Sequence, residues 1–245
     1  MRRAGGHGTT GAMEQSEPIT VAEIPPEQLA AAAEPLPRLR RLEGRWLVPD
    51  SAFAAQMALK ERLISAMPER VLGAIPGSEA SIEEAVEVVT AETGLRPEGT
   101  PLERLARATQ ADICLLQAQD GAHVLIAAAL CFPSGWTLSE KLGRSMDRIH
   151  VPVPPYDEAI GRRVERMFAN LRPGEIVWRA NLMRHDDFRL FRAKTEAEPH
   201  DEPGLPEARR WLRSERQTLM RLPRSGAILF AIHTSMARSP AAGGA

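Results

Sequence analysis

Cysteine, tyrosine and lysine are scarce in this chain of 245 residues. It has two cysteines, Cys114 and Cys131, and lysine occurs only at Lys60, Lys141 and Lys194. Two thiols are too few for a disulfide framework, a four-thiolate iron–sulfur cluster or a four-cysteine zinc site. A chain without disulfides suits a reducing compartment, so we expect a cytoplasmic location.

An excess of one charge and long apolar runs are also missing. The chain has 31 Lys and Arg against 32 Asp and Glu, and its formal net charge is -1. A general nucleic-acid-binding protein would carry a basic excess, so we predict no nucleic-acid partner. The longest apolar run, Val124–Phe132, is far shorter than a membrane span, and no apolar stretch typical of a secretory signal follows the first arginines. We therefore expect no membrane partner.

Several catalytic and binding motifs are absent from the sequence. It has no G-x-G-x-x-G and no Walker P-loop, which argues against a self-contained dinucleotide or nucleoside-triphosphate site. It also has no H-E-x-x-H, no paired C-x-x-C and no G-x-S-x-G elbow. These absences exclude the common zinc-protease and α/β-hydrolase interpretations.

The length and the apolar content of 43% favour one packed domain. Residues 1–36 are rich in Gly, Ala, Glu and Pro without a periodic pattern, so we predict a disordered tail there. We expect a single domain over residues 37–236 and a second disordered tail over 237–245.

Helices are predicted in the first half of the domain. Apolar spacing indicates helical structure over Phe53–Ile75, and Pro68 divides it into two short helices. Ser81 and Glu84 have the spacing of a capping box, which predicts a helix start at Ser81, and Gly94 fits its end. Residues 101–110 are predicted to form another helix.

Strands appear after residue 110. Residues 113–117 and 123–132 indicate a hairpin around the Asp120–Gly121 turn. Further strands are expected over 176–183 and 227–235, helices over 138–142, 157–171 and 206–222, and an extended segment over 149–154. This order predicts an α+β fold with a largely antiparallel sheet of about five strands and flanking helices.

Two groups of side chains stand out chemically. His150 precedes the stiff Val-Pro-Val-Pro segment, which suits either a structural histidine or a ligand held for a large cofactor. Arginines gather at 213, 216, 221 and 224, around the predicted end of the helix over 206–222. They form either a charged outer face or a clamp for carboxylates. Arg179 follows Trp178 in a predicted strand, where it would need a buried or ligand anion.

Seven segments in order resemble the haem-dependent oxidative N-demethylase family. The resemblance runs from about residue 45 to 235. Its segments are Asp112–Leu116, Leu130–Trp136, Glu140–Gly143, Ile149–Pro154, Val177–Asn181, Glu215–Leu219 and Arg221–Ser225.

The resemblance implies a PAS-like fold and a haem b bound through a histidine. It also implies that NADPH supplies electrons through FMN and a [2Fe–2S] cluster on reductase partners. Dioxygen is then activated at the iron, and a small secondary amine such as dimethylamine is converted to a primary amine and formaldehyde. The missing dinucleotide and iron–sulfur motifs agree with a haem subunit that a separate reductase serves.

For the cofactor, the resemblance implies that His150 is the axial ligand of the iron. It makes Arg179, Arg216 and Arg224 candidates for binding the haem propionates. Trp136 is a candidate for packing against the macrocycle.

For the chemistry, the resemblance makes Glu215 the candidate that holds a cationic amine or relays protons. The sequence departs from the family pattern at Leu182 and Met183, where an aromatic residue often follows the asparagine, and Tyr156 is the only tyrosine.

Two other interpretations stay open: a non-catalytic haem sensor on the same fold, and a PAS-like ligand or interaction module without haem.

Overall fold

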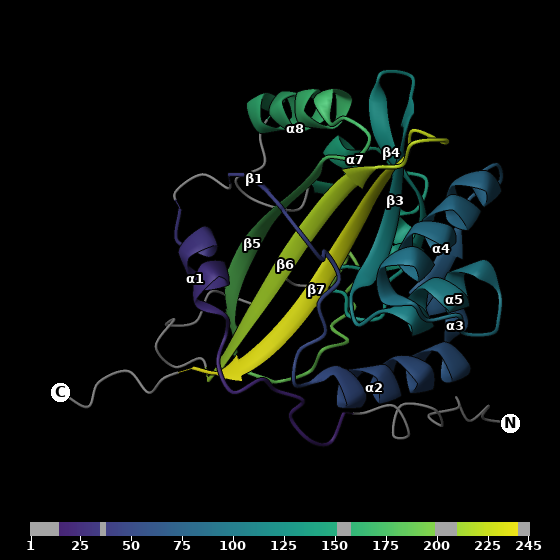
Figure 1. The fold of residues 1–245 in the computed structure, drawn as a ribbon. Coiled ribbons are helices and arrows are strands. Elements are labelled where there is room, and N and C mark those ends of the chain that lie inside the picture. Colours follow the sequence, from purple (N-terminus) through teal and green to yellow (C-terminus); the bar gives the residue numbers. More distant parts are fainter. Residues whose placement is uncertain (1–14, 35–37, 151–157, 199–209, 240–245) are drawn as a thin grey trace, which may run out of the picture.

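One antiparallel sheet of seven strands runs through the domain, with helices on both of its faces (Figure 1). The computed structural model describes residues 15–34, 38–150, 158–198 and 210–239. The strand order is β1-β5-β6-β7-β3-β4-β2. The strands are β1 (Arg40–Arg41), β2 (Leu72–Ala74), β3 (Asp112–Gln119), β4 (Ala122–Ala129), β5 (Ile176–His185), β6 (Trp211–Arg221) and β7 (Ile228–Arg238). The helices are α1 (Pro26–Ala32), α2 (Phe53–Ala66), α3 (Pro68–Val71), α4 (Glu79–Thr93), α5 (Pro101–Ala108), α6 (Leu138–Lys141), α7 (Met146–His150) and α8 (Glu158–Asn170).

The predicted α+β class and the antiparallel pairing are confirmed, but the strand count is higher than expected. The short edge strands β1 and β2 have two and three residues, which is too short for a periodic signal. The predicted helix over 206–222 is wrong, because residues 211–221 form strand β6 in the interior of the sheet. Nearly every position of β6 is buried on both faces, so the alternation that reveals a half-exposed strand is missing.

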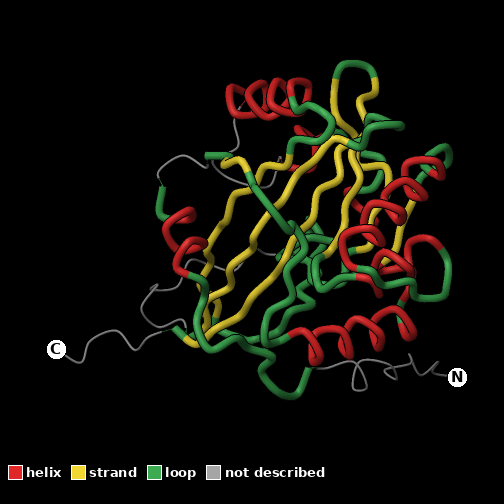
Figure 2. The backbone as a smooth tube through the Cα atoms, viewed as in Figure 1, coloured by secondary structure: helices red, strands yellow, loops and turns green. Residues whose placement is uncertain are grey.

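The two faces of the sheet pack against different helices (Figure 2). On the first face, Ile113, Leu115 and Leu229 contact the apolar sides of α2, α4 and α5. On the second face, Cys114 and Ile228 lie in a cluster with α6, α7 and α8. No helix in the described part of the chain is both long and apolar enough to cross a bilayer.

Local signals explain several element ends. The hairpin between β3 and β4 turns at Asp120 and Gly121, whose φ angles of 49° and 85° suit the predicted turn. Gly94 ends α4 with a φ of 74°, as predicted. The predicted capping box at Ser81 is wrong, because α4 already begins at Glu79 and Ser81 lies inside it. A capping box is instead formed at α5, where Thr100 and Glu103 bond reciprocally.

The N-terminal part of the described chain is more ordered than the sequence suggested. The expectation of a tail without structure through residue 36 is wrong for residues 15–34, which include α1. Val21 and Ile24 are buried against Leu212, and Gln28 accepts a hydrogen bond of 2.8 Å from Ser214 Oγ. At the other end, β7 continues to Arg238, two residues past the expected boundary.

The segment before α2 crosses the first face and is fastened to β7 through Asp50. Asp50 Oδ2 lies 3.0 Å from both His233 Nε2 and Ser235 Oγ, and Oδ1 accepts a bond of 2.6 Å from Gln110 Nε2. Burial raises the pKa of Asp50, but the hydrogen bonds from His233 and Gln110 outweigh it and lower the pKa to about 2. The ionised carboxylate therefore holds this segment on the sheet.

A buried ion pair fastens α2 to the start of β3. Lys60 Nζ lies 3.2 Å from Asp112 Oδ1, and the exposed fractions of the two side chains are 0% and 1%. The same ammonium donates to the carbonyls of Thr109 and Ala111 at 3.1 and 2.7 Å. Asp112 Oδ2 accepts a bond of 2.6 Å from the Phe132 N–H. Both charges are thus compensated inside the core.

We expect Lys60→Met to lower the free energy of unfolding by about 3–5 kcal/mol, because it leaves the Asp112 carboxylate buried without its cation. Urea unfolding followed by tryptophan fluorescence measures the change. Arg62→Met, at an exposed position of the same helix, is the control and should change stability by less than about 0.5 kcal/mol. Equal stability of Lys60→Met and the wild type would show that the ion pair is dispensable.

We expect the stability difference between the wild type and Asp50→Asn to shrink as the pH falls from about 5 to about 2. The folded pKa of Asp50 lies below its ordinary value of 3.8, so its contribution is complete above that value and is lost as the pH falls through about 2. Urea unfolding at each pH measures this. Asp147→Asn, at an exposed carboxylate, should show no such trend. A difference that does not depend on pH would contradict the role of the Asp50 charge.

Candidate functional site

A row of polar side chains lies on the second face, across strands β5 and β6. Arg179 is opposite Gln217 and Asn181 is opposite Glu215, so the four side chains project from the same face. Arg179 Nε donates to Gln217 Oε1 at 2.7 Å, and Asn181 Nδ2 donates to Glu215 Oε2 at 3.2 Å. Gln217 Nε2 donates to the same Glu215 oxygen at 3.4 Å. We call these four residues the polar row.

Arg213 holds Glu215 from the neighbouring position on the same face. Its side chain is completely buried, and Nε donates to Glu215 Oε1 at 3.0 Å. Its other nitrogens donate to the carbonyls of Leu190 and Phe132 at 3.1 and 2.6 Å. Sequence analysis missed this pair, because it treated residues 206–222 as a helix. In a strand, the spacing Arg-x-Glu-x-Gln puts all three side chains on one face.

The polar row borders the apolar cluster of the second face. Trp136 and Ile149 pack into this cluster beside Phe230 and Ile232, so the structure places the predicted Trp136 there. His150 follows Ile149 and is the last residue of α7. The expected extended conformation is therefore wrong for residues 149 and 150, and residues 151–154 lie outside the described residues. The side chain of His150 also lies outside them, and its role as a ligand stays a prediction.

Arg216 and Arg224 lie elsewhere in the fold. Arg216 points to the first face, where Nη1 donates to the Trp46 carbonyl at 3.1 Å and the guanidinium lies 5.5 Å from the Trp178 ring centre. Burial there lowers the pKa of Arg216. Arg224 lies in the exposed turn after β6, 2.7 Å from Glu87. The structure therefore does not bring Arg179, Arg216 and Arg224 together.

The predicted arginine cluster at a helix end is wrong for the same reason that the helix is wrong. Successive residues of a strand point to opposite faces, so Arg213 and Arg216 are separated by the sheet. Arg221 lies at the end of β6, where it donates to the carbonyls of Leu171 and Gly226 at 2.7 and 2.8 Å. These arginines stabilise separate parts of the fold rather than one anion.

The other described histidines have protein partners. His123 Nδ1 lies 2.5 Å from Glu165 and its ring packs on Phe168, and His233 is held by Asp50. The acidic residue Asp187, which follows His185, binds Arg189 at 2.8 Å and also pairs with Arg192. Within the described ranges, no group of three or more His, Cys, Asp or Glu side chains is arranged to hold a metal ion.

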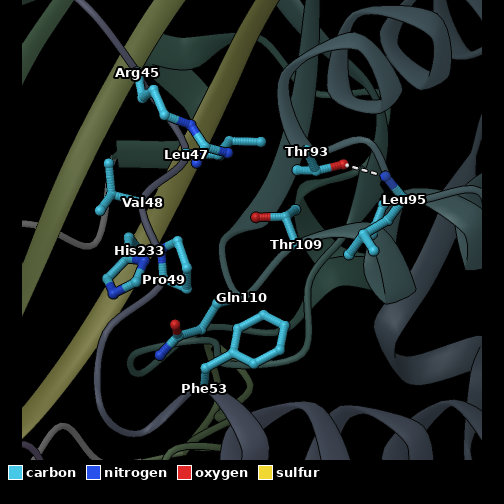
Figure 3. A pocket seen from close by; sticks show the side chains of 11 residues that line it. Arg45, Leu47, Val48, Pro49, Phe53, Thr93, Leu95, Thr109, Gln110 and His233 are labelled. Atoms are coloured by element: carbon cyan, nitrogen blue, oxygen red, sulfur yellow. Dashed lines mark hydrogen bonds between the residues drawn. The ribbon is translucent and has the colours of Figure 1, made fainter.

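A small cavity lies on the first face, between the segment before α2, the end of α4 and β7 (Figure 3). Its volume is about 120 Å³, well below the roughly 300–1,000 Å³ of ordinary ligand pockets. Its polar groups already bond to the protein: Gln110 to Asp50, and Thr109 Oγ to the Ala111 N–H at 3.1 Å. This cavity does not suit a macrocycle.

The chemistry of the second face fits a haem better. A haem requires an imidazole for the iron, an apolar surface for the ring and cations for two propionates. The second face has the apolar cluster with Trp136, and Arg179 lies beside it. The backbone of His150 lies at the edge of the same cluster, next to Ile149. In the described residues, the second face thus offers the apolar side chains and one cation, Arg179.

A comparison with protein families agrees with this chemistry. The family model described as haem-dependent oxidative N-demethylase, alpha subunit-like, matches residues 89–240. This range is more than half of the chain and includes the polar row, Arg213, Trp136 and His150. Residues 45–88, where the sequence resemblance was expected to begin, lie before the match. The chain therefore belongs to the haem-dependent oxidative N-demethylase alpha subunit-like family.

Proposed function

We propose that this protein is the haem-binding catalytic subunit of an oxidative N-demethylase that acts on a small secondary amine such as dimethylamine. The polar row supports this proposal most directly. It puts a buried carboxylate, Glu215, beside the apolar cluster to which Trp136 and Ile149 belong. A buried acid that faces an apolar surface suits a small cation with methyl groups.

Glu215 is the group that we propose to bind the amine. Small alkylamines are protonated at neutral pH, as the lysine side chain is, so a carboxylate attracts them. A carboxylate accepts about four hydrogen bonds, and three described side chains donate to Glu215: Arg213, Asn181 and Gln217. The remaining capacity is available to an ammonium N–H. A proton-relay role would use the same position.

The cofactor would be haem b, with His150 as the iron ligand, Arg179 near a propionate and Trp136 against the ring. Bound haem supplies the iron chemistry that activates dioxygen for oxidation of the N-methyl carbon, and the products are a primary amine and formaldehyde. This chain contributes the binding surface and the orientation of the amine. We further propose the PAS-like fold and the cytoplasmic location for this subunit.

The electrons would come from NADPH through FMN and a [2Fe–2S] cluster on reductase partners. The two cysteines of this chain are unsuited to holding such a cluster. Both are buried, and burial raises the pKa of the Cys131 thiol to about 12 and that of Cys114 further. An all-cysteine iron–sulfur cluster needs four thiolate ligands, and this chain has two cysteines. A cluster therefore requires another polypeptide or domain.

We expect His150→Ala to lose the Soret absorption band that the wild type shows after addition of hemin, because the iron loses its imidazole. Visible spectra of the purified proteins test this. His185→Gln, at the half-buried end of β5, is the control and should keep the band. A band that is lost in His185→Gln and kept in His150→Ala would move the ligand to His185. A wild type that takes up no hemin would remove the haem proposal.

We expect Glu215→Gln to keep haem and to weaken binding of dimethylamine by about tenfold or more, because the amide lacks the charge that attracts the ammonium. Titration of the haem-loaded protein with dimethylamine, followed by the visible spectrum, gives the affinity without any reductase. Glu87→Gln, an exposed acid on α4, is the control and should bind the amine normally. Loss of haem from Glu215→Gln would assign Glu215 a structural role instead.

A further inference from the structure

Lys141, the last residue of α6, is a buried cation beside the end of α7. Its side chain is only 4% exposed, and lysine is almost never buried unless its ammonium is paired. Lys141 Nζ donates to the carbonyl of Ile149 at 2.9 Å and to Glu196 Oε1 at 2.6 Å. This one ammonium therefore connects α6 to the last turn of α7 and to the segment that follows β5.

Glu196 holds the ammonium in place from the side of that segment. Arg148 donates to both of its carboxylate oxygens, at 3.0 and 2.8 Å. The hydrogen bonds from Arg148 and Lys141 lower the pKa of Glu196 to about 2. The backbone N–H of Glu196 donates to Glu140 Oε2 at 3.0 Å, which fixes the segment to α6. The carboxylate that faces Lys141 is thus ionised at neutral pH and attached at several points.

The end of α7 needs a donor of this kind. The helix has five residues, and the Ile149 N–H bonds to the Ser145 carbonyl at 2.9 Å. Pro152 and Pro154 follow in the sequence, and proline has no N–H with which to continue the helical bonding. The last carbonyls of a helix lack partners within the helix, and a lysine near the end can bond to them. Lys141 does so at the Ile149 carbonyl.

The Ile149 carbonyl belongs to the peptide unit that leads to His150. A peptide unit is planar, so a hydrogen bond that fixes the direction of this carbonyl also fixes the backbone N and Cα atoms of His150. The side chain of Ile149 packs into the apolar cluster of the second face, to which Trp136 also belongs. The two contacts of Ile149 together place the Cα atom of His150 at the edge of that cluster.

We propose that Lys141 is a positioning residue for His150, because its ammonium gives the peptide unit between residues 149 and 150 one fixed orientation. This inference rests on the proposed function, in which His150 is the haem ligand. Groups that orient a metal ligand without touching the metal change metal affinity by about 10- to 100-fold when they are replaced. Lys60, which is also buried, is bonded to Asp112 and to backbone carbonyls at the start of β3 and does not contact α7.

Titration of the purified proteins with hemin, followed at the Soret band, tests this role. Lys141→Met removes the ammonium but keeps a long side chain, and it should weaken hemin binding by about tenfold or more. Lys141→Arg keeps the charge and the N–H donors and should restore the affinity to within about threefold of the wild type. Lys194→Met makes the same change at a half-buried lysine near Glu196 and should alter the affinity less than about twofold. Circular dichroism checks that the variants are folded, and Lys141→Gln replaces Lys141→Met if the latter is not.

Hydrogen exchange in the haem-free proteins follows the same contact without the cofactor. The amide of Ile149 should exchange at least about tenfold faster in Lys141→Met, whereas the amides of β6 and β7 should keep the protection that they have in the wild type. Unchanged exchange at Ile149 would overturn the proposal. So would a hemin affinity of Lys141→Met equal to that of the wild type, or a loss that Lys141→Arg does not reverse. In those outcomes the wild type still binds hemin, whereas a wild type that takes up no hemin would remove the proposed function itself.

Discussion

The completely buried guanidinium of Arg213 is the constraint on which the centre of this structure depends. A buried charge without compensation is strongly destabilising, so Arg213 requires an anion and polar acceptors within reach. Glu215 provides the anion, and the carbonyls of Phe132 and Leu190 provide acceptors from two loops. The position of Glu215 is therefore determined by folding, before any ligand binds.

Arg213 is connected to helix α2 through the backbone of Phe132 and the side chain of Asp112. The Phe132 carbonyl accepts from Arg213 while the Phe132 N–H donates to Asp112, which pairs with Lys60. Buried charges thus link the first-face helix α2 to the polar row on the second face. A carboxylate held by such a network is preorganised, and fixed geometry is what a binding site for a small amine needs.

The two faces of the sheet are chemically distinct as a result. On the first face, polar side chains at the small cavity of Figure 3, such as His233 and Gln110, form hydrogen bonds with Asp50. On the second face, the polar row meets an apolar cluster that includes Trp136. Arg216 belongs to the first face because it alternates with Glu215 and Gln217 along β6. The sheet therefore separates the polar row from the small cavity.

Sequence reasoning recovered the elements that carry a clear turn signal or an apolar stripe. The β3–β4 hairpin and α8 have clear turns or apolar stripes, and both were predicted with small errors at their ends. Strand β6 was missed because its buried second-face positions include Arg213, Glu215 and Gln217. These polar residues of the candidate site replace the apolar side chains whose alternation would have indicated a strand. Glu215 was predicted through the family resemblance. Its pairing with Arg213 is recognisable only when both residues are known to lie in one strand, where they point to the same face.

The electrostatic character of α8 shows a second limit of sequence patterns. Between residues 158 and 170 the helix has three arginines and two glutamates, a mixture that by itself indicates an ordinary solvated surface. The sign of the outer face depends on His123 of β4, which takes Glu165 inward across 42 positions of sequence. Because that pairing is tertiary, the local sequence does not reveal it. The carboxylate of Glu165 thereby leaves the outer side of α8, where Arg166 is exposed.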